Sequence, residues 1–468
     1  MGLNKFLKTN WKLCVCFLLL LFGFFNVSIL ECTAAFTENA SSICASDLHE
    51  LVLLSNGTVW AWGSNSCGEC GQEISEDNSD FSSPKMVNSL SDIREVSTGL
   101  FASFALANDG TVWSWGSNIA GQLGRGFQVT YSTSDYRWKP EPIPGLSNVI
   151  AIASSPQGFA LALKDDGTVW AWGYNNFGQL GNGAVPIGEY AISPVQVEGL
   201  GDVKSIAAGY KNAFAVKNDG TVWAWGSASS VFPVNDGNKA GIARLPQIVP
   251  DITDVKSMAI DDGYALLLKN DGTVWAWGSD WRGALGINSS KSNTPDNVIT
   301  STPIQVPGLS DVVAIDVSNG HSVALCRDGS VWSWGANYGG QLGDGSIEDR
   351  NKPWRIPVKN IVLISGSYMV DSEGNIYKCD KNGVSRLDFK FNSGNEGPQQ
   401  SMNSTEETPA ISEQPVSTEQ ADLFPSEQAN STPGSSSPLP GGNSILMIGV
   451  VLFTVILLGL IVYLVVRK

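Results

Sequence analysis

The chain has 468 residues, with 45 acidic and 29 basic side chains, a formal net charge of −16 and a pI near 4.6. Nucleic-acid binding requires a concentrated basic surface. No basic cluster is evident in the repeated part of the sequence, so a nucleic-acid partner is not expected.

The first predicted element is a secretory signal peptide at residues 1–35. Lys5, Lys8 and Lys12 precede an apolar run over residues 13–30, and small side chains follow at residues 33–35. This layout is typical of a signal that directs the chain across a membrane. The alternative, an uncleaved N-terminal membrane anchor, stays open at this point.

The central part of the chain, residues 36–391, returns seven times to one phrase, Gly-Thr-Val-Trp-x-Trp-Gly or a recognisable relative of it. Self-similarity at a spacing of 45–57 residues indicates an array of supersecondary units. The seven copies open at Gly57, Gly110, Gly167, Gly220, Gly272, Gly329 and Gly374.

Each copy predicts four short strands. In the third copy, residues 150–153 and 159–163 are apolar runs, an Asp-Gly turn ends at Gly167, and residues 168–172 and 194–197 complete the unit. Asp-Gly tolerates the positive φ angles that a tight hairpin needs. Seven such units predict an all-β fold, a seven-bladed β-propeller of four-stranded antiparallel blades, and a linear solenoid is the competing arrangement.

The repeats resemble the family named after the regulator of chromosome condensation. The likeness rests on the Gly-x-Val-x-x-Trp-Gly core, on the Asn-x-x-Gly-Gln-Leu-Gly turn at residues 175–181 and its equivalents, and on the small apolar strand before them. It implies a seven-bladed propeller, most like secreted prokaryotic members, which bind protein partners across one face through aromatic loop residues. The fourth copy lacks the Gly-Gln-Leu-Gly turn, and the seventh has Tyr377 and Cys379 instead of the tryptophan pair.

Twelve tryptophans occupy paired repeat positions, such as Trp170 and Trp172. Their regular register predicts packing between neighbouring blades. The functional alternative is ultraviolet sensing, which one plant branch of the family performs through clustered tryptophans. The Gly-Trp-Arg-His-Thr phrase of that branch is absent from this sequence, so the structural role is favoured.

Variable connections interrupt successive copies at equivalent points, for example at about 125–140, 182–193 and 344–354. They are expected to emerge on a common face of the disc as a partner-binding surface. Aromatic and arginine side chains usually anchor such surfaces, although here they could simply cap the blade edges. The candidate partner-binding residues are Tyr131, Tyr136, Trp138, Tyr190, Phe232, Trp281, Arg282, Arg350 and Trp354.

Cys67 and Cys70 form a Cys-x-x-Cys motif. A zinc ion would need two further ligands, and no second pair is evident, so a structural disulfide or two packed thiols is expected. Cys44 in the first blade and Cys379 in the last are candidates for a disulfide across the ring closure.

No catalytic constellation is evident in the sequence. His49 and His321 occupy the position of the family's structural histidine, so neither is expected to be catalytic. We expect no catalytic residue, metal or cofactor, and hence no enzyme, although a propeller fold alone does not exclude chemistry in a central channel.

The C-terminal part predicts a membrane tether. Residues 392–443 are rich in Ser, Thr, Pro, Glu and Gln, which is typical of a disordered stalk. Residues 444–466 are uncharged and long enough to span a bilayer as a transmembrane helix, and the basic pair 467–468 is typical of a cytoplasmic flank.

The sequence therefore predicts a single-pass cell-membrane protein with an extracellular propeller and a cytoplasmic C-terminus. Its expected function is binding of a protein or glycan ligand by a monomeric propeller. The alternative, implied by the founding member of the family, is guanine nucleotide exchange on a small GTPase. That function requires cytosolic exposure and an inserted wedge, and no wedge can be named from the sequence.

Overall fold

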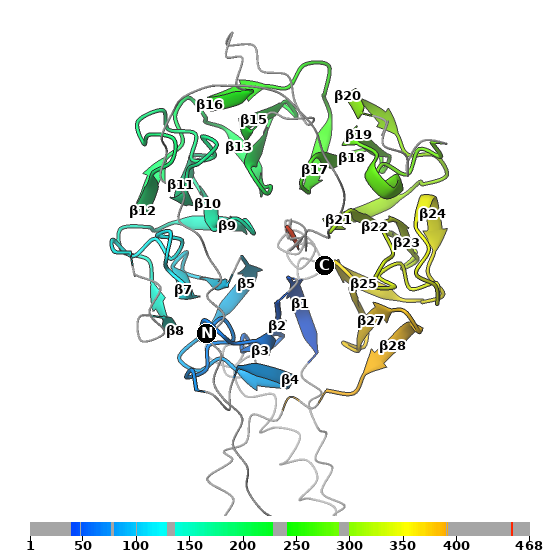
Figure 1. The fold of residues 1–468 in the computed structure, drawn as a ribbon, viewed down its shortest axis with the longest axis horizontal. Coiled ribbons are helices and arrows are strands. Elements are labelled where there is room, and N and C mark those ends of the chain that lie inside the picture. Colours follow the sequence, from blue (N-terminus) through cyan, green and yellow to red (C-terminus); the bar gives the residue numbers. More distant parts are fainter. Residues whose placement is uncertain are drawn as a thin grey trace, which may run out of the picture. The chain divides into compact units, whose positions relative to one another are not determined.

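The computed structural model describes residues 39–46, 48–75, 79–99, 101–128, 136–227, 241–289, 299–389, 391 and 451–452. Seven antiparallel sheets surround a common centre as blades (Figure 1). The sequence prediction of a seven-bladed propeller with four-stranded blades is confirmed, and the solenoid alternative is wrong.

The blades follow the chain order, and each begins with its innermost strand. Blades 1 to 4 are β1 (Ala40–Ala45), β2 (His49–Leu54), β3 (Val59–Ser64), β4 (Asp80–Met86); β5 (Ile93–Thr98), β6 (Ala102–Ala107), β7 (Val112–Gly116), β8 (Arg137–Pro142); β9 (Val149–Ser154), β10 (Phe159–Lys164), β11 (Val169–Tyr174), β12 (Tyr190–Gln196); and β13 (Val203–Ala208), β14 (Asn212–Lys217), β15 (Val222–Ser227), β16 (Ile242–Ile248).

Blades 5 to 7 are β17 (Val255–Ile260), β18 (Tyr264–Lys269), β19 (Val274–Ser279), β20 (Ile299–Gln305); β21 (Val312–Ser318), β22 (His321–Cys326), β23 (Val331–Gly335), β24 (Arg350–Arg355); and β25 (Ile361–Ser365), β26 (Tyr368–Asp371), β27 (Ile376–Asp380), β28 (Gly383–Leu387). The two-residue strand β29 (Val451–Leu452) pairs with β21.

Asp-Gly turns join the second and third strands of most blades. In blade 3, Asp166 Oδ1 accepts the N–H of Thr168 at 2.9 Å, and Gly167 has a φ of 77°. A Cβ on Gly167 would lie 3.0 Å from the backbone nitrogen of Asp202, which belongs to the turn that leads into blade 4. Glycine is therefore required here both for its backbone conformation and for the close approach of the next turn.

In blades 2, 3, 4 and 6 the second tryptophan of the repeat packs on the turn of the preceding blade. Trp172 is buried, its Nε1 donates to the carbonyl oxygen of Gln122 at 2.9 Å, and its ring lies against Gly124. The tryptophan and the Gly-Gln-Leu-Gly turn recur together along the sequence because the turn of one blade receives the indole ring of the next blade. The predicted packing between blades is confirmed for the second tryptophan of the pair, with equivalent bonds from Trp115 to Glu69, Trp225 to Gln179 and Trp334 to Ala284.

Blade 7 consists of four consecutive strands of its own, β25 to β28, so the ring closes without a strand from the N-terminal residues that the structure describes. The backbone N–H of Ala45 in blade 1 donates to Ser365 Oγ in blade 7 at 3.0 Å. The hydroxyl of Tyr368 in blade 7 donates to Glu50 Oε1 in blade 1 at 2.6 Å. Side-chain contacts, rather than a strand exchanged between the chain ends, thus join the first and last blades.

Several predicted segments lie outside the described residues: the signal peptide at 1–35, the stalk at 392–443 and, apart from Val451–Leu452, the transmembrane helix at 444–466. In the part of the chain that the structure describes, no helix has the length and apolar character needed to cross a membrane.

Candidate partner-binding surface

In blades 1 to 6, one end of the sheet carries the long connection between the third and fourth strands. In an antiparallel blade, the turn between the first and second strands and the connection between the third and fourth strands leave the sheet at the same end. We call this end of the propeller the loop face. The short helix η3 (Trp281–Gly283) lies there, in the connection between β19 and β20.

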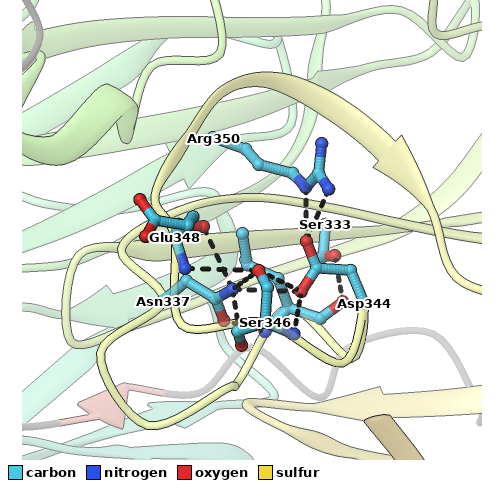
Figure 2. Close-up of polar contacts among 7 residues, drawn as sticks. Ser333, Asn337, Asp344, Ser346, Glu348 and Arg350 are labelled. Carbon is cyan, nitrogen blue, oxygen red and sulfur yellow. Dashed lines mark hydrogen bonds and ion pairs between the residues drawn. The ribbon is translucent and has the colours of Figure 1, made fainter. Parts of the chain in front are cut away.

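A buried asparagine fixes the long connection of blade 6. Asn337 Oδ1 accepts the N–H of Leu342 at 3.0 Å, and its Nδ2 donates to the carbonyl oxygens of Ser346 and Glu348 at 3.1 and 3.0 Å (Figure 2). The N–H of Asn337 donates to Asp349 Oδ1 at 2.8 Å. The side chain of Asn337 therefore fixes the connection between β23 and β24 through hydrogen bonds to its backbone. Equivalent bonds run from Leu123 to Asn118, Leu180 to Asn175 and Leu285 to Asp280.

Two exposed aromatic rings of the loop face enclose an arginine. Trp281 and Tyr338 are 43% and 54% exposed. The guanidinium carbon of Arg282 lies 4.8 Å from the ring centroid of Trp281 and 5.7 Å from that of Tyr338. Arg282 Nη1 also donates to Asp349 Oδ2 at 2.9 Å. We call these four residues the Trp281 cluster, which brings blades 5 and 6 together at the loop face.

The Trp281 cluster is held in place by its surroundings. Arg282 has a φ of 56°, a conformation that a non-glycine residue adopts only when its neighbours impose it. The Trp281 ring rests on Gly320, where a Cβ would lie 3.0 Å from Cζ3. Asp349 is in turn fixed by Asn337. A surface arranged before binding loses less side-chain freedom when a partner arrives.

Arg350 and Trp354 form a second pair on β24. The guanidinium carbon of Arg350 lies 4.5 Å from the ring centroid of Trp354, and Arg350 Nε donates to Asp344 Oδ2 at 2.6 Å (Figure 2). Partial burial acts to raise the pKa of Asp344, but hydrogen bonds from Ser346 and Arg350 outweigh it and lower that pKa. Asp344 therefore stays ionised beside Arg350.

Blades 3 and 4 extend the aromatic surface. Tyr190 contacts Tyr174 edge to face, with ring centroids 5.0 Å apart. Lys211 Nζ lies 5.5 Å from the ring centroid of Phe177 and 5.0 Å from that of Tyr210. Sequence reasoning missed Tyr338, Lys211 and Asp349. The available signal for Tyr338 was its place directly after Asn337, which matches the place of Trp281 after Asp280.

The remaining candidates take different places. Trp138 covers Gly68 of blade 1, where a Cβ would lie 2.6 Å from Trp138 Cβ, so its backbone caps the neighbouring connection. Tyr136 is half-buried beside Cys67. These two residues fit the alternative of edge capping. Tyr131 and Phe232 lie outside the described residues.

All five described cysteines are free, so the expected disulfide between Cys44 and Cys379 is wrong, and of the two alternatives for Cys67 and Cys70 the packed thiols are the ones observed. Cys44 Sγ faces blade 2 and lies 3.1 Å from Thr98 Oγ1, whereas Cys379 lies against Gly343 of blade 6. The two thiols therefore point to opposite neighbours across the ring closure. Cys379 occupies the tryptophan position of its repeat, which explains its contact with the glycine of the preceding turn.

The Cys-x-x-Cys pair of blade 1 consists of packed thiols. Cys70 Sγ lies under the turn, 3.1 Å from the carbonyl oxygen of Ser64, in the position of the buried Leu123. Burial and the neighbouring charge of Glu69 raise the pKa of Cys67 to about 11. Both thiols are thus protonated at neutral pH. Within the described ranges, no group of three or more His, Cys, Asp or Glu side chains could hold a metal ion.

His49 has a structural environment. Its Nε2 lies 2.7 Å from Ser103 Oγ of blade 2, and burial lowers its pKa to about 3. His321 is also buried, and its Nδ1 lies 2.7 Å from the carbonyl oxygen of Ser318. Neither imidazole is accessible at the loop face, which agrees with the sequence interpretation of both residues.

Comparison with known proteins identifies the repeats. A family model described as the regulator of chromosome condensation (RCC1) repeat matches residues 56–106, 109–160, 166–216, 271–325 and 328–369, more than half of the chain. A second model with the same description matches residues 40–69, 93–122, 149–179, 203–230 and 312–341.

The relatives have diverse names. The chain is 27% identical to protein pim1 of Schizosaccharomyces pombe over 64% of its own length and 60% of pim1, less than two thirds of that relative. It is 26% identical to the ultraviolet-B receptor UVR8 of Arabidopsis thaliana over 71% of its length and 73% of the receptor. These relatives are eukaryotic, so the expected likeness to secreted prokaryotic members is not confirmed.

A solved structure supports the fold. Prp20p of Saccharomyces cerevisiae, whose structure was described with its binding properties to Gsp1p and histones, superposes with a TM-score of 0.58 at 24% identity. The superposition covers 69% of this chain and 79% of Prp20p. At this identity the likeness carries the propeller fold and nothing more specific.

Proposed function

Because this chain belongs to the regulator of chromosome condensation (RCC1) repeat family, we propose that it is a non-catalytic propeller that binds a protein partner through its loop face. Prp20p, which has a similar propeller, was described with its binding properties to Gsp1p and histones, and this supports an interaction role in general. The identity of the partner does not follow from this likeness.

The observation that carries the proposal is the Trp281 cluster. Trp, Tyr and Arg are the side chains that most often dominate the energy of protein interfaces. Here all three lie exposed or half-exposed in one cluster, with the arginine charge balanced by Asp349 at 2.9 Å. A partner can bury the two rings without leaving that charge unpaired.

The proposal places the propeller outside the cell, tethered to the membrane. Its support comes from the signal-like residues 1–35, the polar residues 392–443 and the apolar residues 444–466 followed by a basic pair. On that surface a glycan is a second ligand class, since exposed aromatic rings can also cover sugar faces.

The alternative function is guanine nucleotide exchange, as implied by the founding member of the family. It requires the propeller to face the cytosol. Protease added to intact cells distinguishes the two placements, because an external propeller is digested while an internal one stays intact until the membrane is opened. Protection of the propeller would favour the exchange function.

Partner capture tests the loop face directly. A soluble fragment of residues 36–391 is used to capture proteins from the native membrane, in parallel with the variants Trp281→Ala and Tyr338→Ala. We expect both variants to lose the captured protein while their unfolding midpoints stay within the error of the parent. The matched control is Trp138→Ala, which removes an aromatic ring at the edge of blade 2. Equal capture by all four proteins would contradict the proposal.

A further inference from the structure

The outer strand of blade 6 carries three Lys or Arg side chains, compared with two on β8 and one each on β4, β16 and β28. Residues 350–359, which comprise β24 and the turn after it, contain four Lys or Arg side chains and no Asp or Glu. The outer strands β12 and β20 of blades 3 and 5 contain no charged residue. This local basic group corrects the sequence interpretation that the repeats hold no basic cluster, and it stands out in a chain of net charge −16.

Three of these cations are exposed and outside any ion pair, although the charge of Arg355 acts on Asp328 and contributes to the lowered pKa of that carboxyl. Arg350 is paired with Asp344 and stacked on Trp354. Lys352, Arg355 and Lys359 are exposed and form no ion pair among the residues that the structure describes. Trp354, which is 38% exposed, lies on the same strand between Lys352 and Arg355. In sequence, Lys352 precedes the apolar ring and Arg355 follows it, and the side chains of Trp354 and Arg355 point to opposite faces of the strand because they are adjacent.

The position of β24 leaves one side of the strand open. It pairs with β23 on its inner side and has no strand on its outer side within the described blade. Edge strands offer unpaired backbone groups to an extended segment of another chain, although Pro353 removes one donor here. The register of β24 with β23 shifts between Arg350 and Trp354, so the regular part of the edge is the end that carries Trp354 and Arg355.

We propose that the outer edge of blade 6, formed by Lys352, Trp354, Arg355 and Lys359, binds an acidic, extended segment of a partner protein. Carboxylates of that segment meet the three free cations, and an apolar side chain covers the Trp354 ring. A protein segment is favoured over nucleic acid because three free cations on an acidic molecule neutralise too few phosphates for tight binding. This surface lies on the rim of the propeller and is separate from the Trp281 cluster on the loop face.

The test measures binding of the purified full chain to a fluorescent ten-residue peptide of alternating glutamate and valine, by fluorescence anisotropy. The variant K352Q/R355Q/K359Q removes the three free cations. Its matched control, K85Q/K139Q/R244Q, removes one exposed cation each from β4, β8 and β16, so both proteins have the same net charge. Exposed charge pairs contribute little individually, so we expect about a tenfold loss of affinity for the triple variant and less than twofold for the control.

Further arms separate the alternatives. The same peptide with lysine in place of glutamate is expected not to bind, and Trp281→Ala is expected to leave peptide affinity unchanged even if it abolishes capture of the loop-face partner. No binding of the acidic peptide, or equal losses in both triple variants, would overturn the proposal. Tighter, cation-dependent binding to phosphatidylserine vesicles or single-stranded DNA would overturn it too, since the rim would then serve a membrane or a nucleic acid.

Discussion

The ring of Phe389 lies 5.1 Å from the ring of Trp62, centroid to centroid, and this contact joins the end of blade 7 to blade 1. In blades 2, 3, 4 and 6, the second tryptophan packs on the Gly-Gln-Leu-Gly turn, or a variant of it, in the preceding blade. Blade 7 has no such turn, because only two residues connect β27 and β28. Phe389 and Phe391, which contact Trp62 and Trp60, take its place.

Replacing Phe389 with alanine is therefore expected to weaken the ring closure. A half-buried phenyl ring lost from an aromatic cluster should lower the free energy of unfolding by about 1–3 kcal/mol, less than for a fully buried ring. Urea unfolding of residues 36–391 measures it. The control is Tyr338→Ala, an exposed ring expected to change stability by less than about 0.5 kcal/mol. Equal effects of the two substitutions would show that Phe389 does not close the ring.

The paired tryptophans allow a test of position within one repeat. Trp172→Phe removes a buried indole N–H and leaves the carbonyl oxygen of Gln122 without its donor, so a loss of about 2 kcal/mol is expected. Trp170→Phe, two residues away, removes a partly exposed contact to Thr168 Oγ1 at 3.3 Å and should cost less than about 1 kcal/mol. Chemical unfolding decides the order, and a larger loss for Trp170→Phe would contradict the blade-to-blade role of Trp172.

The fold could be predicted from the sequence because the same apolar runs and glycine turns recur in successive repeats. The strands of blade 3, for instance, begin and end within a few residues of the expected positions. The role of Phe389 could not be predicted, since it depends on which blades meet when the ring closes. The disulfide between Cys44 and Cys379 failed for a related reason. The spacing of the repeats placed both cysteines in adjacent blades. It could not show that the Cys44 thiol faces blade 2 and the Cys379 thiol faces blade 6, away from each other.

The candidate site was partly accessible to sequence reasoning. Trp281 and Arg282 stand out because they replace the less distinctive residues of other turns. Tyr338 occupies the matching place in blade 6, yet its relation to Arg282 depends on how far two blades are rotated about the centre. The contact of Asp349 with Arg282 joins residues 67 positions apart in sequence and needed the folded connection of blade 6.

A buried carboxyl between blades 6 and 7 should make stability depend on pH. Asp316 Oδ2 accepts the N–H of Gly366 at 2.7 Å, and burial raises the pKa of Asp316 to about 8. In the unfolded chain this carboxyl has an ordinary pKa of about 4, so between those values unfolding releases a proton. Stability contributed by this group is therefore full at low pH and falls as the pH rises from about 4 to 8.

The variant Asp316→Asn keeps an oxygen for Gly366 but cannot titrate. We expect it to lose less stability than the parent between pH 5 and pH 8, by about 1 kcal/mol or more. Thermal or urea unfolding across this range provides the measurement. Asp166→Asn is the control, because Asp166 is exposed and hydrogen bonds from Thr168 lower its pKa. Parallel pH profiles of the parent and Asp316→Asn would mean that Asp316 is ionised in the folded protein.

Gly320 offers the sharpest test of the arrangement at the loop face. Its φ is 75°, and a Cβ would lie 3.0 Å from Trp281 Cζ3, so Gly320→Ala strains the backbone and also displaces the indole ring. Gly308→Ala is a matched control, since Gly308 has a φ of 81° and nothing within 4 Å of its would-be Cβ. Both substitutions should cost about 1 kcal/mol of stability through the backbone. Only Gly320→Ala should reduce partner capture, because only it moves Trp281 away from Arg282. If both variants capture the partner as well as the parent does, the position of the Trp281 ring does not determine binding.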